Sequence, residues 1–318
     1  MRMTRITKRE IDTKNMNYDD WLEQRKYSLG GSDAGTILGF NKYKSPYTLY
    51  WEKLEPEMKE DLSNNEAIHF GNVLEDVVAR EFTRRTGKKV RKHNKMMFHD
   101  DYDFLSANVD RVVVGEKAIL ECKTANQFKE KEWKDDNVPA SYMAQCYHYL
   151  AVTGYERAYI AVLIGGQTFH WTVIERDDEV IEQIIESEKD FWYNHIQAQI
   201  PPDVDGSAST ESTLNKLWHE TQPTSMTIEE EQSARFRAVM SIKQQIKDLR
   251  AEQREHENKI KELLGENEEG ATTNYRATWK RQSSKRIDTK RLKEEQPEIY
   301  NAYIKESNSR PLKISEVE

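Results

Sequence analysis

The first two hundred residues alternate between segments with helical and with strand-like spacing of apolar side chains. Residues 68–86 carry apolar side chains on one helical arc and are followed by Gly87, the residue type that most often ends a helix. The positions on this arc are Phe70, Leu74, Val77, Val78 and Phe82. We therefore predict a helix over residues 68–86.

After this helix the pattern predicts two pairs of strands and two more helices. The strand pairs are residues 104–114 with 118–124 and residues 158–164 with 168–175. Gly115 supplies a turn for the first pair, and Gly165-Gly166 is a favoured two-residue hairpin turn for the second. Residues 139–153 and 177–198 have helical spacing. A mixed sheet flanked by helices, in an α/β or α+β fold, accounts for this order of elements.

The clearest predicted boundary is PPDVDGSAST at residues 201–210, which is rich in proline, glycine and serine. It separates a predicted core domain, residues 1–200, from a mainly helical C-terminal extension, residues 211–318. In this extension apolar residues follow heptad spacing, interrupted by Gln253 and His256, and predict a helical hairpin or a short coiled coil. The apolar positions are Val239, Ile242, Ile246, Leu249, Ile260 and Leu263.

Composition narrows the class of protein. No window of the 318 residues holds the roughly 20 apolar residues needed to cross a bilayer, and the N-terminal MRMTRITKRE lacks the apolar stretch of a secretory signal. The only two cysteines, Cys122 and Cys146, are too few for a four-cysteine zinc or iron–sulfur site. We expect a soluble cytoplasmic protein.

The formal net charge of −8 changes this picture little. It argues mildly against a general nucleic-acid coat protein, because nonspecific affinity for nucleic acids comes from neutralising phosphates. It does not exclude an enzyme that confines its basic residues to one groove.

The segment NVDRVVVGEKAILECKTA carries the candidate chemistry. Side chains alternate across a strand, so Glu121 and Lys123 share one face, whereas the face with Leu120 packs into the core. Asp110, on the preceding predicted strand, reaches Glu121 if the two strands pair. Two carboxylates and a lysine suit a hard divalent cation, and the lysine can stabilise charge on a phosphate or orient a water. An ordinary cross-strand ion pair is the alternative that this short pattern leaves open.

Five segments occur in the order found in a known enzyme family. They are WLEQRKYSLGGSDAGTILG at 21–39, FGNVLEDVVAREF at 70–82, ANVDRVVVGEKAILECKT at 107–124, ASYMAQCYHYLAVTG at 140–154 and HWTVIERDDE at 170–179. In these segments the chain resembles the YqaJ-type viral recombinases of the PD-(D/E)xK nuclease superfamily, which include the exonuclease of phage lambda. The resemblance implies an α/β restriction-endonuclease-like core. Val109 stands where the superfamily name has a proline, at a position that commonly varies.

The resemblance implies a metal site and a catalytic lysine. Asp110 matches a bridging metal ligand, and Glu121 matches a second ligand, with the backbone carbonyl of Cys122 completing that site. Glu75 matches a helical glutamate that supports a second metal, and Lys123 matches the catalytic lysine. One or two Mg²⁺ ions are therefore expected, with Mn²⁺ as a substitute.

The resemblance also assigns residues outside the predicted strands. Gln145 and Tyr149 match a QxxxY element, in which Gln145 acts in catalysis and Tyr149 contacts DNA. Arg25 and Ser32 match positions that hold a 5′-terminal phosphate. Structural roles remain open as well, with Tyr149 as a partly buried core residue and Ser32 as a helix cap.

Periodicity alone does not single out Glu75. Glu81 lies on the apolar arc of the same predicted helix, so we expect it to be a buried ion-pair partner. His69 and His99 have no His or Cys neighbours at ligand spacing and are expected to be surface or core residues.

The activity implied by the resemblance is Mg²⁺-dependent digestion of linear duplex DNA from 5′ to 3′, leaving a 3′ overhang for homologous recombination. A ring-shaped trimer, an origin in a phage or prophage and a single-strand annealing protein as partner rest on the resemblance alone. A site-specific or structure-specific endonuclease and a catalytically silent protein that binds DNA ends remain alternatives. For the C-terminal extension, an oligomerisation element, a partner contact and a DNA-guiding arm remain open.

Overall fold

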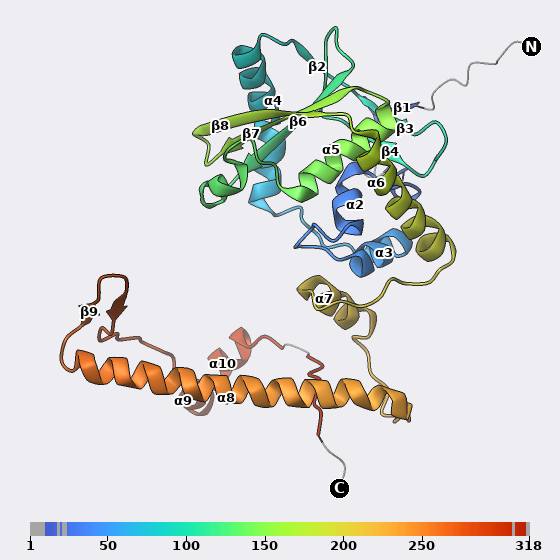
Figure 1. Ribbon diagram of the computed structural model, residues 1–318. Coiled ribbons are helices and arrows are strands. Elements are labelled where there is room, and N and C mark those ends of the chain that lie inside the picture. The colour runs from blue at the N-terminus through green and yellow to red at the C-terminus, as the bar shows by residue number, and fades with distance from the viewer. Residues whose placement is uncertain (1–9, 18–19, 21–23, 307–308, 316–318) are drawn as a thin grey trace, which may run out of the picture. The chain divides into compact units, whose positions relative to one another are not determined.

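The computed structural model describes residues 10–17, 20, 24–306 and 309–315 (Figure 1). The chain divides into two compact units, which span residues 1–218 and 219–318. The boundary between these units lies after the segment predicted as a linker.

A five-stranded mixed sheet forms the centre of the first unit, in the order β2-β5-β6-β7-β8. These strands are β2 (Val90–Lys92), β5 (Arg111–Val113), β6 (Ala118–Ala125), β7 (Arg157–Ile164) and β8 (Thr168–Glu175). Only β6 and β7 run parallel, and the other neighbours are antiparallel. The strands predicted at residues 118–124, 158–164 and 168–175 are therefore confirmed, and so is the mixed α/β fold class.

The strand predicted at residues 104–114 is confirmed only in part, because it is not continuous. Two short strands replace it, β4 (Ser106–Ala107) and β5. β4 belongs to a second sheet, which also contains β1 (Glu10–Asp12) and β3 (Lys95–Phe98). Asp110 lies in the connection between the two sheets, so its carboxylate is not fixed by the alternation of a strand.

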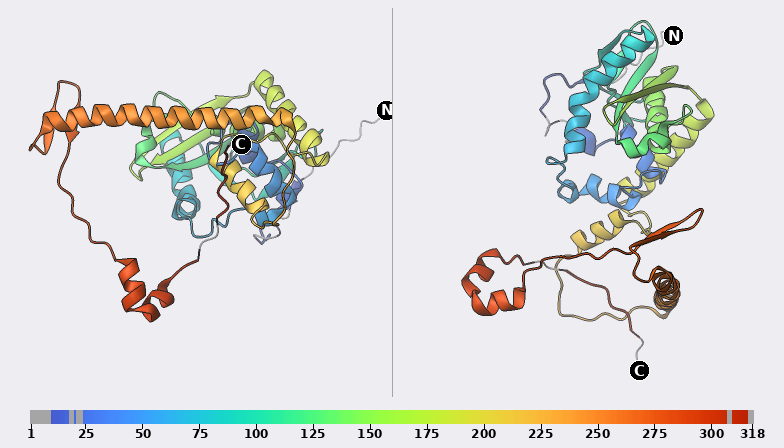
Figure 2. Two further views of the ribbon diagram at one scale, coloured as in Figure 1. Left: turned by 90° about the horizontal axis from the view of Figure 1, so that it is seen from below. Right: turned by 90° about the vertical axis from the view of Figure 1, so that its left-hand side faces the viewer.

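Helices cover both faces of the five-stranded sheet (Figure 2). On one face, Val78 and Phe82 of α4 (Glu66–Thr86) pack against Leu120. On the other, Leu150 of α5 (Ala140–Thr153) packs in the cluster that contains Ile119. Because both faces are covered, Ile119 is as fully buried as Leu120.

The apolar arc predicted for α4 is buried only in its second half. Val78 and Phe82 are at most 1% exposed, whereas Phe70 is 50% and Val77 is 38% exposed. Gly87 ends the helix in the left-handed conformation, as predicted (φ 72°).

The other helices that the structure describes in the first unit contact α5 or are joined to it through neighbouring helices. They are α2 (Gly31–Ile37), α3 (Pro46–Leu54), α6 (Asp178–Asp190) with its π-helical continuation η3 (Phe191–Gln197), and α7 (Ala208–Leu217), besides the 3₁₀ segments η1 (Pro56–Met58) and η2 (Gln127–Trp133). α6 begins where the Asp177 carboxylate accepts the backbone N–H groups of Glu179 and Val180. Hydroxyl contacts join α7 to the start of α3, with Ser45 Oγ 2.8 Å from Thr210 Oγ1.

The second unit is dominated by α8 (Ser233–Leu264), a continuous charged helix. The other elements are η4 (Glu230–Gln232), β9 (Glu269–Ala271), β10 (Arg276–Thr278), α9 (Thr289–Glu295) and α10 (Pro297–Tyr303). Ile246 and Leu263, two of the heptad positions, are 43% and 86% exposed. Among the helices that the structure describes, none is both long and apolar enough to cross a bilayer.

Candidate active site

Asp110 and Glu121 come together where β5 and β6 pair. Asp110 precedes β5, and its Oδ2 accepts a hydrogen bond of 2.8 Å from the backbone N–H of Cys122. Glu121, in β6, is 3% exposed. Burial, and then the charge of Glu121, raise the pKa of the Asp110 carboxyl well above its ordinary value. The site therefore holds two carboxylates that repel each other in a buried environment.

Glu121 uses only one of its two carboxylate oxygens. Oε1 accepts hydrogen bonds from Lys123 Nζ at 2.7 Å and from Gln145 Nε2 at 2.8 Å. Oε2 is buried and has no hydrogen-bond partner within the described part of the chain. A buried carboxylate oxygen is unfavourable unless a hydrogen bond or a cation compensates for lost hydration. The second oxygen thus marks a place for a further positive group.

Lys123 is a fixed positive charge in this cluster. Its Nζ lies 3.0 Å from Gln145 Oε1 and 4.6 Å from the centre of the Tyr142 ring. Burial by itself would lower the pKa of Lys123, but the charges of Glu121 and Asp110 outweigh it and raise that pKa. Lys123 is therefore suited to electrostatic stabilisation and not to proton abstraction.

α5 contributes Gln145 and Tyr149 to the same network. Gln145 Nε2 donates to Tyr149 Oη at 3.0 Å as well as to Glu121. Both side chains are buried. Burial, followed by the charge of Glu121, raises the pKa of the Tyr149 hydroxyl well above its ordinary value, so the tyrosine is neutral. One hydrogen-bonded network thus joins four of the predicted residues, namely Glu121, Lys123, Gln145 and Tyr149.

Glu75 is bound to Arg111, a residue that the sequence analysis did not select. The buried Arg111 guanidinium pairs with the carboxylates of Glu75 and Asp76 and donates to the backbone carbonyl of Asp110 at 2.6 Å. The only signal in the sequence was an arginine directly after Asp110. Such a residue in a strand is ordinarily taken for a surface charge.

Asp110 and Glu121 fit a divalent cation, but the ligand set is incomplete. Among the residues that the structure describes, no three His, Cys, Asp or Glu side chains form a group that could hold a metal ion. The unpartnered oxygen of Glu121 and its repulsion with Asp110 are nevertheless features that a hard cation would relieve. Glu75 would have to leave Arg111 to join them.

Arg25 and Ser32 contact each other, with Nη2 of the arginine 3.1 Å from Oγ of the serine. Gly30 is the N-cap of α2, so the capping role considered for Ser32 is wrong. The acidic neighbour Asp33 is already paired, since it accepts from Lys53 Nζ at 2.8 Å and from the N–H of Gly30 at 3.0 Å. The Arg25 guanidinium and the Ser32 hydroxyl therefore lie together, and the charge of the neighbouring Asp33 carboxylate is already balanced by Lys53.

Gly31 brings this turn against the Glu121 network. A Cβ atom at Gly31 would lie 2.5 Å from Cε1 of Tyr149 and 3.0 Å from Cγ of Gln145. Only glycine permits this approach. The turn that carries Ser32, the partner of Arg25, therefore packs against Gln145 and Tyr149.

The sequence analysis missed a buried pair between α5 and α6, His148 and Glu188. His148 is fully buried, with Nδ1 2.6 Å from Glu188 Oε1 and Nε2 2.8 Å from the carbonyl oxygen of Ser106. The N–H of Ser106 in turn donates to the carbonyl of Leu29, next to the Gly30 turn. The pair thus links α5 and α6 to the chain that leads into the Arg25–Ser32 site.

Glu81, His69 and His99 were expected to have structural roles. The Glu81 side chain is 25% exposed and pairs with Arg84 and Arg85 at 2.7 Å each. Their hydrogen bonds lower the pKa of Glu81 to about 2. The predicted ion pair is confirmed, but its burial is wrong. His69 is exposed and His99 is half-buried.

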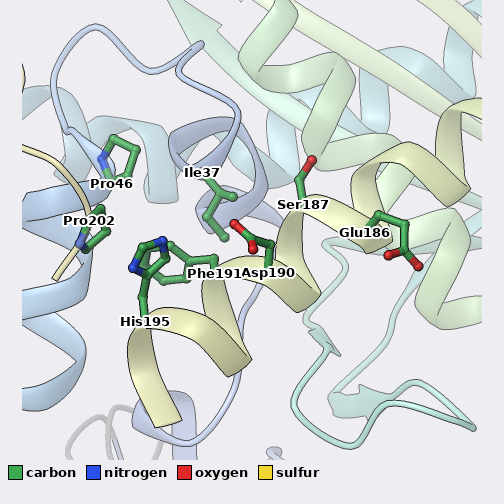
Figure 3. Close-up of a pocket in the computed structure, with 8 residues that line it drawn as sticks. All are labelled: Ile37, Pro46, Glu186, Ser187, Asp190, Phe191, His195 and Pro202. Carbon is green, nitrogen blue, oxygen red and sulfur yellow. The ribbon is translucent and has the colours of Figure 1, made fainter. Parts of the chain in front are cut away.

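A pocket of about 430 Å³ is lined by none of the predicted site residues (Figure 3). Its lining residues are Ile37, Pro46, Glu186, Ser187, Asp190, Phe191, His195 and Pro202. The carboxylates of Glu186 and Asp190 would repel a phosphate group. This pocket does not fit a nucleic-acid backbone.

Comparison with known proteins decides the family. The family model described as "YqaJ-like viral recombinase domain" matches residues 20–156. The uncharacterized protein YqaJ of Bacillus subtilis (strain 168) is 44% identical over 313 residues, which cover 97% of this chain and 98% of the relative. The chain belongs to the YqaJ-like viral recombinase family. The family resemblance seen in the sequence is thereby confirmed.

This YqaJ-like chain shares the fold of one solved exonuclease structure. The alkaline exonuclease of Laribacter hongkongensis is 19% identical, with a TM-score of 0.50, and the match covers 57% of this chain and 94% of that one. A phage-related exonuclease of Haemophilus somnus 129PT is 16% identical, with a TM-score of 0.43 over 54% of this chain and 95% of that one. At 19% identity, the match to the alkaline exonuclease shows a shared fold and nothing beyond it.

Proposed function

We propose that the protein is a DNA nuclease, and more closely an exonuclease, that hydrolyses phosphodiester bonds. The observation that carries this proposal is the convergence of the half-buried Asp110 and Lys123 on the buried Glu121. A surface ion pair would be exposed and weak. Two carboxylates beside a protonated lysine in a site with little water are suited to a phosphate that gains charge during cleavage. The viral recombinase family and the fold of an alkaline exonuclease support the same activity.

The cofactor in this proposal is Mg²⁺, as one or two ions, with Mn²⁺ as a substitute. Asp110 and Glu121 would hold it, with the backbone carbonyl of Cys122 and, once it is released from Arg111, Glu75 as further ligands. When bound, the ion supplies Lewis acidity to the phosphate and acidifies the attacking water.

The chain's own residues have separate tasks in this proposal. Lys123 holds a positive charge beside the scissile phosphate and stabilises the negative charge that develops there. Gln145 fixes Lys123 relative to Glu121, and its Oε1 can accept one further hydrogen bond from a water. Tyr149 supports Gln145 and faces Gly31, where the DNA end would lie.

The choice of DNA end is the finer part of the proposal. The Arg25 guanidinium and the Ser32 hydroxyl would hold a 5′-terminal phosphate, which carries more charge than an internal diester. Digestion would then run from 5′ to 3′ and leave a 3′ overhang for recombination. A trimeric assembly, a single-strand annealing protein as partner and a phage or prophage origin, with action in the host cytoplasm, rest on the family resemblance.

One experiment separates this function from its alternatives. Linear duplexes labelled at either 5′ or 3′ end, and a closed circular duplex, are incubated with the protein and Mg²⁺, with EDTA as control. We expect loss of the 5′ label first, an intact circle and no reaction in EDTA. Cutting of the circle would indicate an endonuclease. Binding of ends without cleavage would indicate a catalytically silent accessory protein.

A further inference from the structure

We infer that a basic groove between α4 and β2 binds the sugar–phosphate backbone of duplex DNA beside the active site, an inference that rests on the proposed function. The groove has a volume of about 410 Å³. It is lined by Asp76, Ala79, Arg80, Thr83, Val90, Arg91, Lys92 and Arg111. Figure 1 shows that β2 lies at the edge of the sheet.

Positive charge is concentrated in the sequence that forms this groove. Eight of the sixteen residues from 80 to 95 are lysine or arginine and one is acidic, which gives 8 − 1 = +7. The whole chain has a net charge of −8. An acidic protein that binds DNA must collect its basic residues in one region, because affinity for the backbone comes from neutralising phosphates. The α4–β2 region is such a collection.

The lining residues fit phosphates better than they fit bases. The lining has one acidic residue, Asp76, against four basic ones, Arg80, Arg91, Lys92 and Arg111, which gives 4 − 1 = +3. No aromatic residue is among the eight that line it. Single-stranded DNA is ordinarily held by aromatic rings that stack on its bases. The groove therefore favours the backbone of a duplex.

Strand register connects the groove to the proposed catalytic carboxylates. Lys92 of β2 lies opposite Arg111 of β5. Arg111 in turn pairs with Glu75 and donates to the carbonyl of Asp110. A DNA backbone bound at Lys92 would therefore lead to the scissile phosphate beside Asp110 and Glu121.

The ion pair within the groove is weak enough to be replaced by a ligand. Lys92 Nζ lies 3.4 Å from Asp76 Oδ1, and the two side chains are 56% and 59% exposed. Exposed ion pairs contribute little to stability, so Lys92 can turn from Asp76 to a phosphate at small cost. Arg80 is likewise exposed, and its Nε donates to the carbonyl oxygen of Asp76 in its own helix.

The test compares two double variants that remove the same charge. The groove variant is Arg80→Gln/Lys92→Gln. The control is Lys117→Gln/Arg157→Gln, which removes two cations from exposed ion pairs with Glu156 and Glu175. Lys117 precedes β6 and Arg157 begins the parallel β7, so both lie at the end of these strands away from Lys123.

Binding of the full-length proteins to a fluorescent blunt duplex is measured by anisotropy in EDTA, over a series of salt concentrations. For the groove variant we expect the slope of log K against log salt to become shallower by roughly two, about one for each lost phosphate contact. The control should keep the wild-type slope. Thermal melting of all three proteins shows whether each is folded.

Two results would overturn the inference, and they differ in what they say of the proposed function. If the wild type binds and cleaves the duplex and the groove variant keeps its slope, only the groove assignment fails, and an acidic protein surface becomes the better occupant. If the wild type neither binds nor cleaves any duplex, the proposed function fails and the inference fails with it.

Discussion

The Nζ of Lys123 lies 2.7 Å from Oε1 of Glu121, while Oε2 of the same glutamate is buried without a partner in the described part of the chain. One oxygen is therefore neutralised by a fixed cation, and the other is left for a second positive group. This asymmetry gives the two side chains separable roles, because Glu121 can hold a cation while Lys123 acts on the phosphate. Substitutions near this pair should separate metal binding from turnover.

Lys123→Ala should lower the turnover number by about a hundredfold or more, which is the scale of losing one electrostatic stabiliser in a buried site. The affinity for Mg²⁺ should change little, since the carboxylates remain. Initial rates of duplex cleavage over a series of Mg²⁺ concentrations measure both quantities, with Lys117→Ala as a control. Near-normal turnover at excess Mg²⁺ would show that Lys123 has only a metal-supporting role.

Asp110→Asn should abolish turnover and leave the metal-free fold as stable as the wild type or more stable. The amide oxygen can still accept the N–H of Cys122, while the repulsion with Glu121 that raises the pKa of Asp110 disappears. Each kcal/mol gained would raise the melting temperature by roughly 2–4 °C. Melting in EDTA and cleavage in Mg²⁺ are compared. Substantial Mg²⁺-dependent cleavage by this variant would remove Asp110 from the mechanism.

Local patterns in the sequence predicted the elements that carry the site. Apolar runs around Gly165-Gly166 predict a hairpin that the structure contains as β7 and β8, and the strand with Glu121 and Lys123 is found as β6. The break between β4 and β5 falls on Asn108 and Asp110, residue types that are depleted in strands, but local pattern does not show that the two strands join different sheets. The choice between the two sheets depends on tertiary packing.

Local sequence patterns could not predict contacts between elements that are far apart in the sequence. His148 and Glu188 are 40 residues apart, and Arg111 reaches Glu75 across 36 residues. Neither pair has a spacing that marks it in the sequence. The selection of Gln145 depended on the family resemblance, since helical periodicity alone leaves it as a polar residue beside an apolar face.

The His148–Glu188 pair should make stability depend on pH. Burial lowers the pKa of His148, but the charge of Glu188, its hydrogen bonds and the more distant Asp33 raise it above 6.5 in the folded state. A raised pKa means that the bound proton stabilises the fold. The stabilisation by this proton is complete at pH values below the pKa of His148 in the unfolded state, and it is lost as the pH rises through the pKa of His148 in the folded state.

His148→Gln removes the titrating group and should flatten this dependence. The advantage of the wild type over the variant in the free energy of unfolding should be largest below pH 6.5 and should shrink at higher pH. Urea unfolding of both proteins over this range measures the difference. If the unfolding free energies of the two proteins differ by the same amount at every pH, His148 does not change protonation on folding.

Arg25→Ala should remove most of a preference for 5′-phosphorylated ends. A terminal phosphate carries more charge than an internal diester, and the Arg25 guanidinium beside Ser32 should favour it. The wild type should therefore degrade a 5′-phosphorylated duplex faster than a 5′-hydroxyl duplex, and the variant should treat them alike while still cleaving. The same ratio of rates in both proteins, or no preference in the wild type, would argue that Arg25 is an ordinary surface charge.

Gly31→Ala should slow cleavage without removing any functional group. The added Cβ would lie 2.5 Å from Cε1 of Tyr149 and 3.0 Å from Cγ of Gln145, closer than packed atoms tolerate. Overpacking of this kind typically costs about 1–3 kcal/mol of stability. The ring and the amide must shift, and Gln145 can no longer hold both Lys123 and Glu121 at hydrogen-bonding distance.

A displacement of about 1 Å in such a network can lower the rate by roughly a hundredfold. The matched control is Gly206→Ala, where the new Cβ would meet no atom within 4 Å. Turnover and melting temperature are measured for both variants. If Gly31→Ala loses stability but keeps wild-type turnover, the turn at Gly31 only packs against α5, and the position of Gln145 does not depend on it.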